Sequence, residues 1–431
     1  MSFVNRFQSR SNVRPQSFHR PLANTRRPQP SGRSRRIAPT PTEGVFSQSA
    51  DLDVVHPGVD RKREQGSDGE HPGSTRLCRM HDQPPPPEKS LDTKLARLLA
   101  DRACRDFILA DAKDADMAFG LAAPGVAAGG DRLKGPFRSL ADFRDQIREL
   151  VGEGLVDVML MSASTADLLA GGERLFVDSP VTPAVRMNDT TDIWLAAGSG
   201  TYPRQPALPF STTTIPHAQW GRLDPPRSGR PAVDLGLFSI TLNGDAAADR
   251  AMLAAYRDFR HEAERSRFRH FLEVFFPNAL ADAGAAAPLG IARFVADHVV
   301  RGLAGVPRAG RPVFLKIPYL GPEITEQLAA YDPAMIVGIL GGAAGTTHDA
   351  FSLVEQSKRH GARVALFGRK INAAEHQLEF VRHLRAVADD HLPAAEAVRA
   401  YHAALAALGI PPHRPLDHDL AITHTAAAYG G

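Results

Sequence analysis

Residues 313–319 read VFLKIPY, an apolar run interrupted by a single lysine. In a barrel strand, side chains alternate between an apolar helix layer on the outside and the barrel interior. Val313, Leu315 and Ile317 suit the helix layer, which directs Phe314, Lys316 and Pro318 inward. An isolated lysine on the inward side of an otherwise apolar strand indicates a functional position, because lysine is rarely buried without a partner.

Strand–helix units of this kind follow one another from about residue 100 to residue 410. Eight segments have the length and composition of strands, namely Met117–Ala122, Val156–Ser162, Val181–Asn188, Leu237–Asn243, Phe271–Phe276, Val313–Tyr319, Met335–Gly341 and Arg363–Gly368. Amphipathic segments lie between most of them, namely Ser139–Glu153, Ala246–Arg265, Leu289–Leu303, Pro322–Ala330, Thr347–His360 and Ala373–Ala388. Eight alternating units favour an α/β fold closed into a (β/α)₈ TIM barrel over an open doubly wound sheet.

The barrel is expected to occupy residues 91–410, between an N-terminal extension (1–90) and a C-terminal tail (411–431). The extension is rich in Arg and Pro, and every formally charged residue from Met1 to Thr42 is an arginine. It has no helical or strand period, so we predict that it is disordered. An RNA- or phosphate-binding arm, a targeting peptide and a misplaced start are the competing interpretations. The in-frame Met80 favours the last of these.

The bulk composition is that of a cytoplasmic enzyme. The chain is 43% hydrophobic and 23% charged, with no apolar run long enough for a membrane span. It has two cysteines, so a disulfide framework is not expected. The net charge of +3 comes from the arginines of the extension, which argues against nucleic acid as a partner of the barrel. The histidines are scattered without an HxxxH or HxH pair, and we predict neither a metal nor another cofactor.

The alternation rule gathers polar residues of several strands at one end of the barrel interior. These residues are Arg186, Asn188, Asn243, Glu273 and Lys316. The alternative is that Glu273 and Lys316, on adjacent strands, form an internal ion pair that closes the barrel layers. The separation of the two side chains decides between these readings: contact favours an ion pair or an electrostatic clamp, whereas a gap beside a cavity favours a nucleophilic amine.

Residues 190–233 are rich in Pro, Gly, Ser and Thr and show no clear helical period. A loop of this length within a compact domain is either functional or a sign of a wrong assignment. We interpret it as a cover over the active-site rim; a plain surface excursion is the alternative.

The ends of the seventh and eighth strands have the features of a phosphate site. Gly341 and Gly342 end the seventh strand shortly before a helix, and Gly368 and Arg369 end the eighth. Glycines allow the backbone to approach an anion, and barrels frequently bind phosphate in these two loops. We therefore expect a small phosphorylated substrate.

The lysine on strand six, the Gly-Gly after strand seven and the Gly-Arg-Lys-Ile after strand eight resemble class I aldolases of the bacterial and archaeal fructose-bisphosphate type and the deoxyribose-phosphate type. The resemblance implies that Lys316 forms a Schiff base with a carbonyl substrate and that Gly341, Gly342, Gly368 and Arg369 hold its phosphate. The family pattern has an Asp-His-Gly near the end of strand one, where this chain reads Phe119–Ala122. It also has a tyrosine on strand five, where this chain has Phe276.

A Schiff-base lyase of this kind is the first functional hypothesis. Glu273 or Asp189 would move protons, and Arg186, Asn188 and Asn243 would bind the substrate. The alternatives are a sugar-phosphate isomerase or epimerase in which Lys316 stabilises an enediolate, and a non-catalytic barrel that binds a phosphorylated ligand. The sequence is compatible with either a monomer or a homo-oligomer.

Overall fold

The computed structural model describes residues 87–131, 135–191, 195, 199–280, 290–342 and 345–423. The predicted disordered extension and the last residues of the tail lie almost wholly outside these ranges.

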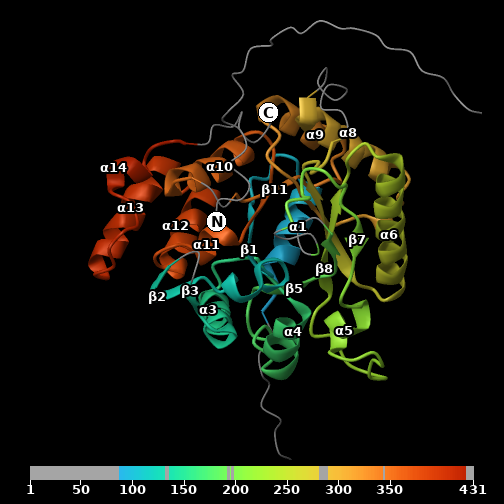
Figure 1. Cartoon of the computed structure of the whole chain (residues 1–431), viewed down its shortest axis with the longest axis horizontal. Helices are drawn as coiled ribbons and strands as arrows, with labels where there is room; N and C mark the ends of the chain where they lie inside the picture. The colour runs from blue at the N-terminus through green and yellow to red at the C-terminus, as the bar shows by residue number, and fades with distance from the viewer. Residues whose placement is uncertain are drawn as a thin grey trace, which may run out of the picture. The chain divides into compact units, whose positions relative to one another are not determined.

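Eight parallel strands form one sheet that closes on itself (Figure 1). The strand order is β10-β9-β8-β5-β4-β1-β12-β11, and a parallel bridge between Ile317 and Ile339 joins the two ends. The strands are β1 (Ile108–Lys113), β4 (Val158–Met161), β5 (Thr182–Arg186), β8 (Leu235–Thr241), β9 (Arg269–Phe275), β10 (Leu315–Lys316), β11 (Gly338–Leu340) and β12 (Val364–Phe367). The predicted TIM barrel is confirmed, with Lys316 on its sixth strand.

Helices surround this barrel. The longer ones are α3 (Leu140–Glu153), α6 (Ala246–Arg265), α8 (Gly290–Ala304), α9 (Pro322–Tyr331), α10 (Thr347–Arg359), α12 (Gln377–Ala388) and α13 (Ala394–Ala407). Short ones follow the carboxyl ends of the strands: α2 (Asp116–Phe119), α4 (Ala163–Ala166), η2 (Asp167–Gly172), α5 (Ile215–Trp220) and α11 (Arg369–Asn372). These bounds agree with the predicted amphipathic segments to within a few residues, because the 3.6-residue apolar period marks the buried face of each helix.

Two apolar clusters divide the core as the alternation rule requires. Leu109, Leu315 and Ile317 belong to the cluster between strands and helices. Phe271 and Phe314 belong to the second cluster, inside the barrel, where their rings stack with centroids 4.6 Å apart. The predicted inward position of Lys316, which follows the same parity as Phe314, is therefore confirmed.

The helix α1 (Ser90–Ala100) closes the end of the barrel at which the strands begin. Its buried residues Leu91, Leu95 and Leu98 pack in the same cluster as the interior strand residues. This helix leaves the carboxyl ends of the strands as the end at which a ligand can enter.

The predicted first strand was wrong. Residues 117–122 form α2 and the 3-10 turn η1 (Gly120–Ala122), and the true first strand is β1. Its polar residues Asp111 and Lys113 prevented its recognition as a strand, because they break the apolar pattern expected of the side that faces the helices. Both side chains are fully buried in that layer. They form an ion pair of 3.1 Å, and the Lys113 amine also donates to Gln377 Oε1 at 2.7 Å.

Glycine at position 338 is required by the closure of the barrel. A Cβ atom there would lie 2.3 Å from the backbone oxygen of Leu315 and 2.7 Å from Cβ of Val364. We predict that Gly338→Ala lowers the free energy of unfolding by about 1–3 kcal/mol through overpacking. Urea denaturation measures this change.

The matched control is Gly152→Ala in α3, where a Cβ would meet nothing within 4 Å. Because alanine restricts the unfolded chain and favours a helix, this variant should gain about 0.5–1 kcal/mol. Equal effects of the two substitutions would contradict the packing argument.

Candidate active site

Arg186 is the centre of a buried charge network at the mouth of the barrel. Its guanidinium contacts Asp114 at 3.0 Å, Asp189 at 3.1 Å and Glu273 at 3.3 Å. Arg186 ends β5, Asp114 follows β1, and Glu273 lies on β9, so one cation joins three sectors of the barrel. All four side chains are almost completely removed from solvent.

Lys316 enters this network through Glu273. Its amine lies 2.7 Å from Glu273 Oε1, and the side chains are 8% and 3% exposed. The other oxygen, Oε2, accepts from Arg186 and from Ser239 Oγ at 2.7 Å. The sequence left open whether Lys316 and Glu273 touch, and they do. In this state Lys316 is the cation of an ion pair, and Glu273 has donors on both oxygens.

The carboxylates of the network differ in their affinity for protons. Burial raises the pKa of Glu273, but the charges of Lys316 and Arg186 and their hydrogen bonds outweigh it and leave the pKa below its ordinary value. Burial raises the pKa of Asp189 to about 6 in spite of its contact with Arg186. Asp189 is therefore the carboxyl group that exchanges a proton near neutral pH.

The two predicted substrate-binding asparagines lie at the mouth, but their amides are engaged by the protein. Asn188 donates to the backbone oxygen of Ser239 at 2.8 Å and accepts from its backbone nitrogen. Asn243 donates to Asn278 Oδ1 at 2.9 Å and accepts from the Ala279 nitrogen at 2.8 Å. Asn188 thus joins β5 to β8, and Asn243 holds the turn after β9. Of the predicted substrate-binding residues, only Arg186 lies in the charge network.

The predicted phosphate residues meet at the ends of β11 and β12. Gly341 and Gly368 are packed closely, since a Cβ on the first would lie 2.2 Å from the Phe367 ring and one on the second 2.5 Å from the Ala112 oxygen. Gly342 follows at the start of the loop before α10. Arg369 begins α11 and lies over the ring of Phe119. Among the described residues, no carboxylate lies within ion-pair distance of the Arg369 guanidinium.

The N-terminus of α10, the longer helix in this sector, already holds an anion. Asp419, from α14 (Leu416–Asp419), accepts from the Thr347 backbone nitrogen at 2.8 Å and from His402 Nε2 at 3.0 Å. Thr346 and Asp349 form a capping box at the same helix end. The described part of the C-terminal tail therefore occupies the helix terminus that follows the predicted phosphate-binding glycines.

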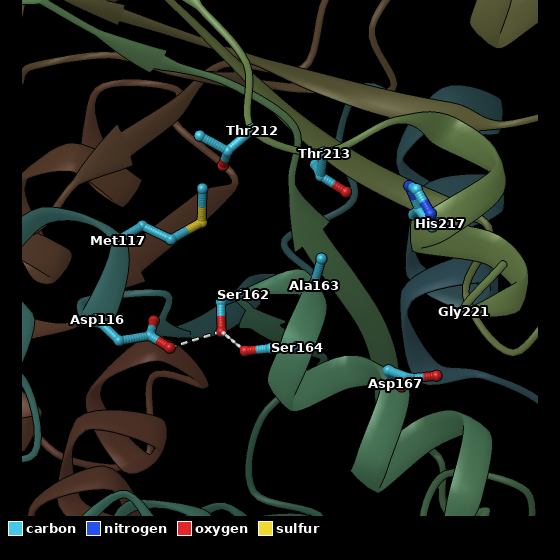
Figure 2. A pocket seen from close by; sticks show the side chains of 10 residues that line it. All are labelled: Asp116, Met117, Ser162, Ala163, Ser164, Asp167, Thr212, Thr213, His217 and Gly221. Atoms are coloured by element: carbon cyan, nitrogen blue, oxygen red, sulfur yellow. Dashed lines mark hydrogen bonds between the residues drawn. The ribbon is translucent and has the colours of Figure 1, made fainter. Parts of the chain in front are cut away.

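The segment 190–233 lies on the catalytic face and forms one wall of a pocket. Asp189–Thr190 (β6) pairs with Pro209–Phe210 (β7), and α5 follows. A cavity of about 420 Å³ separates this segment from the loops after β1 and β4 (Figure 2). Thr213 and His217 face Asp116 and Ser162 across it.

Asp114, Asp116, Ser162 and Ser239 were missed from the sequence. Asp114 and Asp116 were assigned to a loop because the first strand was displaced, and the comparison of Phe119–Ala122 with the family's strand-one motif was wrong for the same reason. With β1 reassigned, an aspartate, Asp114, follows strand one and reaches Arg186. Ser239 lies on β8, and its contact with Glu273 on β9 depends on the register of the two strands, which the sequence alone does not determine.

Within the described ranges, no three His, Cys, Asp or Glu side chains are grouped as metal ligands. The same residues include no helix of sufficient length and apolarity to cross a membrane.

Comparisons with known proteins identify the fold and leave the sequence family open. No family model and no curated protein matches the chain. The structure is similar to the fructose-bisphosphate aldolase from Slackia heliotrinireducens DSM 20476, with a TM-score of 0.51, 16% identity, and 72% of this chain and 89% of that chain covered. The chain has the fold of the class I fructose-bisphosphate aldolases.

Two further structures of this type also match. An archaeal fructose 1,6-bisphosphate aldolase has a TM-score of 0.47 at 16% identity, covering 69% of this chain and 98% of that one. A Schiff-base-forming fructose-1,6-bisphosphate aldolase has a TM-score of 0.48 at 17% identity, covering 70% and 100%. The similarity to the Slackia heliotrinireducens enzyme confirms the expected resemblance as one of fold for the fructose-bisphosphate type, while the deoxyribose-phosphate type is not specifically shown.

The raised pKa of Asp189 predicts a pH-dependent stability. An aspartate of the unfolded chain titrates near pH 4 and the folded one near pH 6. The folded state therefore holds the proton more tightly, and this stabilisation is complete below about pH 4 and lost as the pH rises through about 6. The unfolding free energy of the wild type minus that of Asp189→Asn should fall by up to about 3 kcal/mol between pH 4 and pH 7.5.

Urea denaturation at several pH values measures this difference. The control is Asp178→Asn, because Asp178 is exposed. A difference that stays flat for Asp189→Asn, as it should for the control, would show that Asp189 titrates like a solvated aspartate.

Proposed function

We propose that this protein is an aldolase-like enzyme that makes or breaks a carbon–carbon bond of a phosphorylated ketone or sugar through a Schiff base on Lys316. The observation that carries the proposal is a primary amine at the inward position of strand six, within the buried charge network at the carboxyl ends of the strands. Its 2.7 Å contact with Glu273 is the arrangement expected of an ion pair, so the Schiff base requires a proton transfer within that pair. The fold shared with the fructose-bisphosphate aldolase from Slackia heliotrinireducens is consistent with this assignment.

Proton transfer within the ion pair is the first requirement of the proposal. An ammonium group cannot attack a carbonyl, so Lys316 must lose a proton before it reacts. Glu273 is in direct contact and can accept it. The donors from Arg186 and Ser239 hold Glu273 in place but also weaken it as a base. The approach of a carbonyl group therefore has to drive the transfer, because the resting pair favours the ammonium.

The reaction then runs through groups of this chain. The Lys316 amine adds to the ketone carbonyl, and loss of water gives an iminium ion. Removal of a proton from the neighbouring carbon gives an enamine, which attacks an aldehyde carbon; the new alkoxide takes up a proton, and water releases the product and the amine. We assign the proton transfers to Glu273 and Asp189, because Asp189 titrates near neutrality and both carboxylates contact Arg186.

The phosphate of the substrate is assigned to the end of β12 beside Gly368 and Arg369. Arg369 starts the short helix after strand eight and is exposed to solvent. Barrels of this class often bind phosphate at such a short helix with the loops after strands seven and eight. An arginine fork can hold two phosphate oxygens at once.

Trapping tests the Schiff base. Borohydride reduction in the presence of dihydroxyacetone phosphate should attach the reduced ketone to Lys316, because reduction converts the imine to a stable secondary amine. Mass spectrometry of peptides locates the adduct, and Lys316→Arg should abolish it.

The matched control is Lys370→Arg. Burial lowers the pKa of Lys370 to about 8, which makes it the competing amine at the same mouth, but its amine donates to the Gly345 oxygen at 2.9 Å. The adduct should persist in this variant. An adduct on Lys370, or none with any phosphorylated ketone tried, would overturn the assignment to Lys316.

The contact of Lys316 with Glu273 favours a second candidate, a sugar-phosphate isomerase or epimerase. If Lys316 stays an ammonium, its charge would stabilise an enediolate while a carboxylate moves the protons. We expect an enzyme of this second kind to retain at least a tenth of its kcat/KM in Lys316→Arg and to lose at least about 100-fold in Glu273→Gln. An assay of proton exchange between the substrate and deuterated water measures both. Loss of exchange in both variants would instead agree with the Schiff base.

A further inference from the structure

The pocket between α2, the loop after β4 and α5 is large enough for a small sugar fragment. Its volume is about 420 Å³, which lies in the range of ligand sites. We propose that it binds the uncharged, polyhydroxylated end of the substrate. The aldehyde partner of the reaction is then a neutral hydroxyaldehyde, and the sugar carries one phosphate rather than two. This inference rests on the proposed function.

The charged groups among the lining residues disfavour a second phosphate. Asp116 and Asp167 contribute carboxyl groups to the lining, and none of the lining residues is a lysine or an arginine. Burial raises the pKa of Asp116, but a phosphate dianion beside either carboxylate would be repelled. The charge of the lining thus contrasts with that of the Gly368–Arg369 sector.

The polar groups of the lining suit hydroxyl groups. Ser162 donates to Asp116 Oδ2 at 2.6 Å and lies 3.4 Å from the Ser164 hydroxyl, as the dashed lines in Figure 2 show. Thr213 and His217 lie on the opposite wall. Hydroxyl groups both donate and accept hydrogen bonds and carboxylates accept them, so a chain of substrate hydroxyls finds partners in this lining.

The helix α5, which forms one wall of the pocket, is held in place by a close contact and by its N-terminal cap. Gly221, which ends α5 with φ 66°, approaches Asp167 so closely that a Cβ would lie 2.1 Å from Asp167 Oδ1. Thr214 caps the helix by accepting from the His217 nitrogen. The segment 212–221 therefore forms a wall of the pocket whose position is fixed by its contacts with the rest of the protein.

The charge network leads from Lys316 towards the side of the barrel on which the pocket lies. The pocket lies beside strands one and two, across the mouth from strand six. The network runs from Lys316 through Glu273 and Arg186 to Asp114, and Asp116 follows Asp114 by two residues. A sugar held by its phosphate beside strand eight and by its carbonyl carbon at Lys316 would extend over this network towards the pocket.

A comparison of two acceptors tests the inference. With dihydroxyacetone phosphate as donor, kcat/KM should be at least 10-fold higher for glyceraldehyde than for glyceraldehyde 3-phosphate. Thr213→Arg introduces a cation into the pocket and should shift this ratio at least 10-fold towards the phosphorylated acceptor. The matched control is Ser211→Arg, an exposed position outside the lining, which should leave the ratio unchanged.

Two outcomes overturn the inference: a wild-type preference for the phosphorylated acceptor, or an equal shift in both arginine variants. The trapping experiment on Lys316 needs no acceptor, so it separates failure of the Schiff base from failure of the pocket assignment. If no adduct forms, saturation-transfer NMR with glycerol and glycerol 3-phosphate still decides the charge preference. Thr213→Arg must then favour glycerol 3-phosphate more than Ser211→Arg does, and the absence of that difference rejects the pocket.

Discussion

The contact of the Arg186 guanidinium with three carboxylates is the constraint on which the mouth of this barrel depends. An isolated buried charge is strongly penalised, so each member of the network requires the others. Asp114, Asp189 and Glu273 come from different positions in the chain and are held by one cation. With Lys316 included, the network has two cations and three carboxylates, so it carries an excess of negative charge when all are ionised. Burial is the main cause that raises the pKa of Asp189 to about 6, and the negative charges of Asp114 and Glu273 add to it.

The network also decides what Lys316 can do. A lysine surrounded by apolar groups alone would lose its proton through burial. Here Lys316 contacts Glu273 as one member of an ion pair, and Arg186 shares the same carboxylate. The amine therefore lies beside a group that can accept a proton. Schiff-base chemistry on it requires the substrate to shift a proton between two groups already in contact, whereas enediolate stabilisation requires no shift. The two proposed functions differ in this one step.

Much of the fold could be predicted from the sequence because barrel strands have a strict two-residue period. That period correctly directed Arg186, Glu273 and Lys316 inward, since their neighbours on each strand are apolar and face the helices. The same rule failed for β1, where Asp111 and Lys113 form an ion pair in the helix layer. In sequence, two charged residues at these positions are typical of a polar loop. The roles of Asn188 and Asn243 could not be predicted, because their partners are backbone groups whose position depends on strand register and on the turn at Asn278.

The tail restricts where a phosphate can be bound. In sequence, the glycines before α10 and the basic residues after β12 are equivalent candidates, since both precede a helix N-terminus. The structure separates them, because Asp419 already accepts from the first backbone nitrogen of α10, and a second anion there would meet its charge. Arg369, which begins the short helix α11 and is exposed, has no carboxylate within ion-pair distance among the described residues. The anion site of the proposed enzyme is therefore assigned to the short helix after strand eight, next to the strand that borders α2 and the pocket.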